Sequence, residues 1–179
     1  MSFDAATLQA PLVTDRLTLR APRLSDKGLL EQYCADKRVA EMTTSIPHPL
    51  PPGATEAFIA RANDEARSED IWILDGSENG MPEVIGAIGL QRLDSNQSEI
   101  GYWVAPGFWG QGYAREALSQ LVEKNPQGVR TYFGSVFQDN PASARVLTHC
   151  GFDYIGDAES HSVARGAQVG TWTYLRKLD

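Results

Sequence analysis

The sequence predicts an α+β fold built on a mixed sheet. Three apolar runs, Ile71–Leu74, Val84–Leu90 and Glu99–Val104, follow one another with only turn clusters between them, which is typical of an antiparallel meander. Helical patterns precede and follow this meander, and a further strand pattern, Arg130–Phe137, comes later. The chain of 179 residues has the length of one domain. We therefore expect a single domain over residues 1–179.

The residues before the meander predict one strand and three helices. Residues 14–22 alternate in the manner of a strand. Ser25-Asp26 then offers a helix cap, a short helix is expected around Arg38–Met42, and a third over residues 57–66. The proline-rich turn Ile46–Gly53 lies between the last two helices and predicts a lid-like connection.

The residues after the meander predict two helices and three strands. Pro126 and Gly128 end the first helix, and Asn140 with Pro141 caps the second, which stops at Gly151. The expected elements are, in order, a helix over 114–122, a strand over 130–137, a helix over 140–151, and strands over 152–158 and 170–177.

Composition excludes several classes of protein. Hydrophobic residues make up 42% and charged residues 22% of the chain, and no apolar run approaches the roughly 18 residues of a membrane span. The start, Met1–Asp4, lacks the features of a signal peptide, so we expect a cytoplasmic protein with no membrane contact. The net charge of −7 disfavours nucleic acid and suits a cationic amine. Cys34, Cys150 and the histidines lack metal-ligand spacing, so we expect no metal and reduced cysteines.

The segment Glu99–Leu118 reads as a strand, a glycine-bearing turn and the start of a helix. Such an arrangement points free N–H groups and the positive end of a helix dipole at an anion. A Walker loop is excluded, because Gly112 is followed by Tyr113 and Ala114 rather than by lysine and a hydroxyl residue. A dinucleotide fingerprint is excluded as well, because Arg115 stands where it needs a third small residue.

The remaining pattern, Trp109-Gly110-Gln111-Gly112-Tyr113-Ala114, resembles the acyl-CoA loop of the GNAT N-acetyltransferases. With Trp109 in the first position and Glu116-Ala117 after the loop, it is similar to the ribosomal-protein (RimJ/RimL-like) branch of that superfamily. Three other segments agree with the branch in order, so that the resemblance covers roughly residues 12–178. They are Asp15–Arg20, Ile46–Pro49, and Asn140–Ser143 continuing to Gly151-Phe152.

The resemblance implies a GNAT fold, with a mostly antiparallel twisted sheet of six to seven strands flanked by helices. It places acyl-CoA in a splay between the fourth and fifth strands. It also implies an acetyl-CoA-dependent N-acetyltransferase that works by direct attack of a primary amine in a ternary complex, without a metal, as a monomer or homodimer. The expected acceptor is a protein N-terminal α-amine. The alternatives are a small amine, such as an antibiotic or a polyamine, and a catalytically silent acyl-CoA-binding module.

The resemblance also assigns the cofactor-binding residues. Main-chain N–H groups across Gly110–Arg115 would bind the pyrophosphate, because glycines allow close approach of the backbone. The backbone at Trp103-Val104 would bond the pantetheine arm. Asn140 would bond the pantetheine or a water, or act as a helix N-cap, and both roles could hold together. The expected cofactor-binding residues are Trp103, Val104, Trp109, Gly110, Gln111, Gly112, Tyr113, Ala114, Arg115 and Asn140.

Glu99 is the expected general base, acting directly or through water, since it matches the position of a catalytic glutamate in several family members. Alternation places Glu99, Gly101 and Trp103 on one face of the sheet, where partial burial would raise the pKa of the glutamate toward that of a useful base. The alternative is a solvated or ion-paired strand glutamate.

Ser143 is the expected proton donor to the departing thiolate, by its match to a serine of the ribosomal-protein branch, with Tyr132 and Tyr154 as alternatives. Acceptor selection should fall to the 42–53 turn, its neighbouring helices and the 158–170 connection. His48, within that turn, lines the acceptor site or is a surface residue of the loop.

Overall fold

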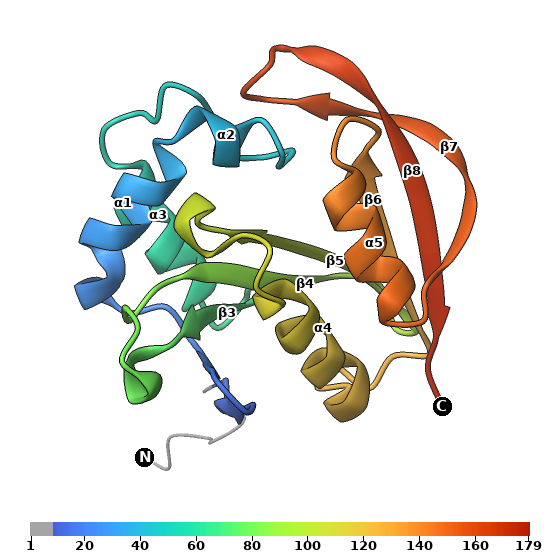
Figure 1. Ribbon diagram of the computed structural model, residues 1–179, viewed down its shortest axis with the longest axis horizontal. Helices are drawn as coiled ribbons and strands as arrows, with labels where there is room; N and C mark the ends of the chain where they lie inside the picture. The colour runs from blue at the N-terminus through green and yellow to red at the C-terminus, as the bar shows by residue number, and fades with distance from the viewer. Residues whose placement is uncertain (1–8) are drawn as a thin grey trace.

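The computed structural model describes residues 9–179, which form one eight-stranded mixed sheet with helices on both faces (Figure 1). The strands are β1 (Leu12–Val13), β2 (Thr18–Arg20), β3 (Glu69–Asp75), β4 (Gly86–Asp94), β5 (Gln97–Val104), β6 (Thr131–Phe137), β7 (Asp153–Ser162) and β8 (Ala167–Lys177). The helices are α1 (Lys27–Cys34), α2 (Lys37–Ala40), α3 (Ala54–Ala62), α4 (Tyr113–Lys124) and α5 (Pro141–His149), with short 3₁₀ turns at 24–26, 77–79 and 106–108.

The strands lie in the order β1-β2-β3-β4-β5-β6-β8-β7, and among the strands of the described residues only β5 and β6 pair in parallel. This confirms the α+β class, the meander β3-β4-β5 and the mostly antiparallel sheet. The strand count is higher than expected. The additional strand is β1, which has two residues and pairs with β2, too few for an alternating pattern.

Two predicted boundaries were wrong for identifiable reasons. The expected loop over 158–170 is mostly strand, because β7 and β8 continue to Ser162 and from Ala167 as one long hairpin. Strand β7 is an edge strand exposed on most of its length, which hid the alternation. The third helix ends at Ala62 rather than 66, because the Asn63 side chain donates to Ile59 O at 2.9 Å and to Pro22 O at 2.9 Å.

A separate hydrophobic core lies on each face of the sheet. Helices α4 and α5 bury Leu118, Leu121 and Leu147 against β4, β5 and β6, while α1 and α3 bury Leu30 and Ile59 against the opposite face. Figure 1 shows α4 and α5 across the centre and right of the sheet, α1 and α3 at the left, and the β7–β8 hairpin curving over the top toward α2. The region between these two helix layers contains the site described next.

Candidate active site

The pairing between β5 and β6 stops halfway along the two strands. It runs from Gln97↔Thr131 to Ile100↔Gly134, although β5 continues to Val104 and β6 to Phe137. Strands that part leave the facing backbone N–H and C=O groups without ladder partners. A cavity of about 620 Å³ is lined by both strands and by residues of both sheet faces. The opening expected between the fourth and fifth predicted strands therefore lies between β5 and β6.

The loop from β5 to α4 has the left-handed backbone that its glycines suggested. Gly110 has φ 71° and Gly112 has φ 84°, values that side chains with a Cβ adopt only with strain. A Cβ at Gly110 would meet no atom within 4 Å, so the space above the loop is open. Within residues 9–179, the N–H groups of residues 110–115 donate to no other residue. Loop and helix thus present a row of free donors.

The side chains of the loop fix its shape rather than fill the open space. The Trp109 indole donates to Val104 O at 2.6 Å and Gln111 Nε2 donates to Gly107 O at 3.3 Å. Tyr113 is buried and donates to Met81 Sδ at 2.8 Å. Ala114 and Arg115 form the first turn of α4, with Arg115 exposed.

Two arginines that the sequence analysis did not assign lie beside this loop. Arg16 Nη2 would be 3.4 Å from a Cβ at Gly112, and the Arg16 guanidinium stacks over the Tyr113 ring at 4.2 Å. Arg38 lies over the Trp109 ring at 5.9 Å. Both guanidinium groups are ion-paired, Arg16 with Glu116 and Arg38 with Asp36, each at 2.8 Å, so they place further N–H donors beside the free N–H groups without adding net charge. Arg16 lies in the segment Asp15–Arg20, which supported the family resemblance, but spacing alone gave no sign that it approaches the loop.

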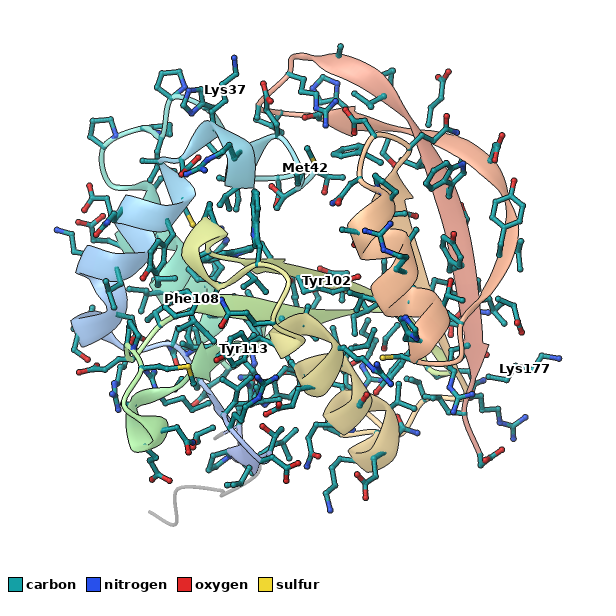
Figure 2. The ribbon with its side chains drawn as sticks, in the orientation of Figure 1. Lys37, Met42, Tyr102, Phe108, Tyr113 and Lys177 are labelled. Carbon is teal, nitrogen blue, oxygen red and sulfur yellow. The ribbon has the colours of Figure 1, made fainter. Side chains whose placement is uncertain are left out.

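Tyr102 and Ser143 form a hydroxyl pair at the opening. The two oxygens are 2.8 Å apart, and Tyr102 also donates to Ser143 O at 3.0 Å. Both residues line the cavity, and Tyr102 lies at the centre of the molecule in Figure 2. Burial raises the pKa of Tyr102 well above its ordinary value. Tyr102 was not among the residues predicted from sequence, although alternation placed it on the sheet face opposite Glu99.

The two tyrosines considered as alternatives to Ser143 lie elsewhere. The Tyr132 hydroxyl is buried and donates to Leu121 O at 2.9 Å. Tyr154 is exposed on β7, and its hydroxyl donates to Asp157. Neither side chain lines the cavity, so both alternatives were wrong about position.

Asn140 caps α5, as its sequence context predicted. Its side-chain oxygen accepts from Ser143 N at 3.4 Å, and the residue also lines the cavity. The cap fixes the first turn of the helix on which Ser143 lies. Trp103 reaches the same cavity from β5 and packs edge-to-face on Tyr33 of α1, with ring centroids 6.3 Å apart.

Glu99 lines the cavity from the opposite sheet face to Ser143. Its side chain is more exposed than the expected partial burial, yet the surrounding protein raises its pKa from the ordinary value by desolvation. Within the described residues it has no ion pair and no hydrogen bond through its side chain. The carboxylate of Glu99 and the hydroxyl of Ser143 thus line one cavity from the two faces of the sheet, at the place where β5 and β6 part.

A second carboxylate, Glu69 of β3, also lines this cavity. Glu69 was not predicted as a site residue, because the predicted strand began at Ile71 whereas β3 begins at Glu69. Burial raises the pKa of Glu69, and the nearby charge of Glu99 acts in the same direction. The only available sequence signal was the acidic residue directly preceding an apolar run.

The segment Glu41–Thr44, which we call the roof segment of the cavity, is held in place by Arg165 in the turn between β7 and β8. Its guanidinium donates to Glu41 O at 2.8 and 3.0 Å and to the Asp139 carboxylate at 2.6 and 3.1 Å. The Val163 N–H donates to Thr44 O at 3.1 Å. Met42, to the right of α2 in Figure 2, belongs to the segment held in this way and lines the cavity.

The proline-rich turn contributes Ile46, Pro47 and Leu50 to the cavity lining, but not His48. In residues 9–179 no group of three or more His, Cys, Asp or Glu side chains is placed to hold a metal ion. No helix within the described part of the chain is both long enough and apolar enough to cross a bilayer.

Comparisons with known proteins agree on one family. A family model described as acetyltransferase (GNAT) domain matches residues 16–153. The uncharacterized N-acetyltransferase p20 of Bacillus licheniformis is 26% identical over 174 residues, which cover 91% of this chain and 93% of that protein. The ribosomal-protein-serine acetyltransferase of Escherichia coli K12 is 30% identical over 101 residues, covering 54% of this chain and 56% of that protein.

Solved structures share the fold at lower identity. The structure of RimL, a ribosomal L7/L12 α-N-protein acetyltransferase in complex with coenzyme A, superimposes with a TM-score of 0.78. It is 19% identical in sequence, and the match covers 94% of this chain and 97% of that chain.

Proposed function

The chain belongs to the GNAT acetyltransferase family, and from this premise we propose that it transfers the acetyl group of acetyl-CoA to a protein N-terminal α-amine. One observation carries the proposal. Strand β5 loses its β6 partner after Ile100 and leads through the loop to the donor-rich N-terminus of α4, and the cavity along the same strand is lined by Glu99 and Ser143 from opposite faces. A thioester held in the opening would be accessible to an amine from one side and to a proton donor from the other.

The residues present fit the cosubstrate. Free N–H groups of residues 110–115 would bind the pyrophosphate, and the glycines leave the space above them open. Arg16, which is paired with Glu116, would offer a further N–H donor beside Gly112. The backbone of β5 at Trp103-Val104, which pairs with β4 but has no β6 partner beyond Ile100, would bond the pantetheine amides as an added strand does.

Two groups of this chain would move the protons. Glu99 would take a proton from the acceptor ammonium, directly or through a water, so that the neutral amine can attack the thioester carbonyl. The Ser143 hydroxyl, backed by the Tyr102 phenol at 2.8 Å, would give a proton to the departing sulfur. The acetyl carbon gains a bond to nitrogen and loses its bond to sulfur, so no covalent enzyme intermediate is needed.

The choice of acceptor is supported by similarity to ribosomal-protein acetyltransferases, one in sequence and one in fold. The cavity wall on the acceptor side combines apolar residues, among them Leu30, Met42 and Phe58, with the carboxylates of Glu69 and Glu99. Such a wall suits an ammonium attached to an apolar or mixed chain end.

Isothermal titration with acetyl-CoA, followed by thiol release against N-terminal peptides and small amines, tests the proposal. Binding with release from peptides is expected. Thiol release with small amines but not with peptides would show that the acceptor is a small amine. Saturable binding with no release from any acceptor would favour a silent acyl-CoA-binding module, and the absence of binding would refute the proposal.

A further inference from the structure

Glu69, Gln91 and Glu99 form one row across three strands. The register pairs Glu69 of β3 with Gln91 of β4, and Gln91 with Glu99 of β5. Paired residues point to the same face, and neighbouring strands lie about 4.8 Å apart, so that the two glutamate Cα atoms are about 10 Å apart. All three residues line the cavity. Two carboxylates therefore face the same space from positions two strands apart.

The Glu69 carboxylate lies directly over Gly89 of the neighbouring strand β4, where no side chain separates it from the backbone. A Cβ placed on Gly89 would be 2.7 Å from Glu69 Oε1. Gly89 pairs with Gly101 of β5, where a Cβ would meet nothing within 4 Å. Gly89 is thus covered by the Glu69 carboxylate, whereas the space above Gly101, one strand nearer to β6, is open.

The charge of Glu69 is not neutralised by its neighbours. Within residues 9–179 its side chain has no ion pair or hydrogen bond. Gln91, between the carboxylates, donates instead to Ser68 Oγ at 2.9 Å. Arg61 of α3 partly opposes the negative charge, but burial and Glu99 together still raise the pKa of Glu69. An uncompensated carboxylate beside a second one costs free energy that a cationic ligand would recover.

An independent observation indicates a polar ligand in this cavity. The Thr171 residue of β8 is 1% exposed and lines the cavity, yet its hydroxyl has no hydrogen-bond partner within the described residues. Buried hydroxyls are normally paired, and an exception calls for an absent partner. Thr171 lies on the β6–β8 side of the opening and Glu69 on the β3 side, so the unsatisfied groups span the cavity.

We propose that Glu69 is a specificity-determining residue that selects acceptors carrying a second cationic centre. The inference rests on the proposed function. The reacting amine lies beside Glu99 and the second cation beside Glu69, within about 10 Å of each other, while Thr171 bonds a polar group of the acceptor. A short diamine and a peptide with a basic residue next to its N-terminus share this chemistry.

Two matched acceptor pairs test the proposal. One pair is 1,5-diaminopentane and pentylamine, and the other is a peptide beginning Ala-Lys and the same peptide with norleucine in place of lysine. In at least one pair, the wild-type kcat/KM for the doubly charged acceptor should be about 10-fold higher at low salt than kcat/KM for its singly charged partner. The pair that shows the preference distinguishes a small amine from a peptide as the source.

Glu69→Gln should remove most of this preference, because it should lower kcat/KM for the dication several-fold more than kcat/KM for the singly charged member of the pair. Glu65→Gln is the matched control, because Glu65 is exposed, lies four residues away and does not line the cavity. The proposal is overturned if neither pair shows a preference, or if Glu69→Gln lowers both members equally.

A binding measurement separates this inference from the proposed function. Titration of the two dications into the protein saturated with coenzyme A should give affinities that Glu69→Gln weakens several-fold and Glu65→Gln does not. If no acceptor releases thiol, the proposed function fails, and this binding difference alone supports or overturns the role of Glu69. Thr171→Val should weaken both peptides to the same extent, since it removes a contact that does not depend on charge.

Discussion

The Tyr102 phenol oxygen lies 2.8 Å from the Ser143 hydroxyl oxygen, where the strand that loses its partner meets the first turn of α5. Because burial raises the pKa of Tyr102, the phenol keeps its proton throughout the neutral range. The Tyr102 hydroxyl has two acceptors within reach, Ser143 O at 3.0 Å and Ser143 Oγ at 2.8 Å, and when it donates to Oγ the serine hydroxyl can donate its own proton to the departing sulfur. The two hydroxyls can therefore relay one proton.

This relay predicts that the two residues act as a unit. Tyr102→Phe and Ser143→Ala should each lower kcat by about 10- to 100-fold, toward the lower end of general acid effects. The double variant should be no slower than the slower single variant, because removing either hydroxyl already breaks the relay. Steady-state thiol release measures the rates, and acetyl-CoA affinity should stay within about 2-fold. Multiplicative losses in the double variant would show that the hydroxyls act separately.

Glu99→Gln should lower kcat by about 100-fold at neutral pH while acetyl-CoA affinity is unchanged. Desolvation raises the pKa of Glu99 above its ordinary value of 4.5, so wild-type activity should fall with decreasing pH as the carboxylate is protonated. The ratio of wild-type to variant activity should be largest between the raised pKa of Glu99 and the α-amine pKa of about 8. Above pH 8 the ratio should shrink, because the amine is already neutral and needs no base. The measurement is kcat/KM from pH 4.5 to 9.

An unaltered pH profile in Glu99→Gln would remove Glu99 from the base role. Glu78→Gln is the control for the loss of one carboxylate outside the cavity. Glu78 is exposed in the turn after β3 and does not line the cavity, so its loss should leave both the rate and the acid limb intact.

The order of the elements was predictable from sequence because each depends on local signals. Alternation identified β4 and β5, and the Asn140-Pro141 cap located the start of α5. The glycines at 110 and 112 indicated left-handed backbone, which the structure confirms. Where the local signal was weak the prediction was wrong, as for the two-residue β1 and the exposed edge strand β7.

Long-range pairing explains what the sequence could not reveal. Glu69 and Glu99 lie thirty positions apart in the chain and share a cavity only through the register with Gln91. Tyr102 meets Ser143 only because α5 packs beside β5, and Arg165 reaches Glu41 only because the β7–β8 hairpin curves over the cavity. No periodicity within one segment encodes such contacts, so alternation could give the face of a residue but not its partner.

Gly112→Asp should abolish acetyl-CoA binding. The change places a side chain and a negative charge beside free N–H groups, at a φ of 84° that also strains any residue with a Cβ by about 1–2 kcal/mol. Gly112→Ala carries the strain without the charge and should retain weakened binding. Gly28→Asp adds the same charge on the exposed face of α1, with no atom within 4 Å of the new Cβ, and should bind normally. Isothermal titration of the three variants decides whether this loop holds the pyrophosphate.

Arg165→Lys should raise the acceptor KM by about 3- to 10-fold and leave the acetyl-CoA affinity unchanged. Lysine keeps the charge but cannot donate at once to Glu41 O and to both oxygens of Asp139. The roof segment Glu41–Thr44, which includes Met42, should therefore be held less firmly against the β7–β8 hairpin. Arg130→Lys, an exposed position with no ion pair in the described residues, is the matched control. An effect confined to kcat, with KM unaltered, would contradict a positioning role.

The Arg20 guanidinium, at the end of β2, forms ion pairs with two buried carboxylates, and these pairs predict how stability depends on pH. It donates to Asp26 at 2.7 and 2.9 Å and to Asp75 at 2.7 Å. Burial alone would raise the pKa of Asp75, but the hydrogen bonds from Arg20 and Ser77 lower it below its ordinary value of 3.8. The stabilisation is therefore fully present above about pH 4 and is lost as the pH falls through the lowered pKa. Asp75→Asn should cost about 3 kcal/mol at pH 7, as expected for breaking a buried pair, and the cost should shrink at acidic pH. Urea unfolding of both proteins from pH 2.5 to 7 measures this difference, and a cost independent of pH would show that the ion pair is not its source.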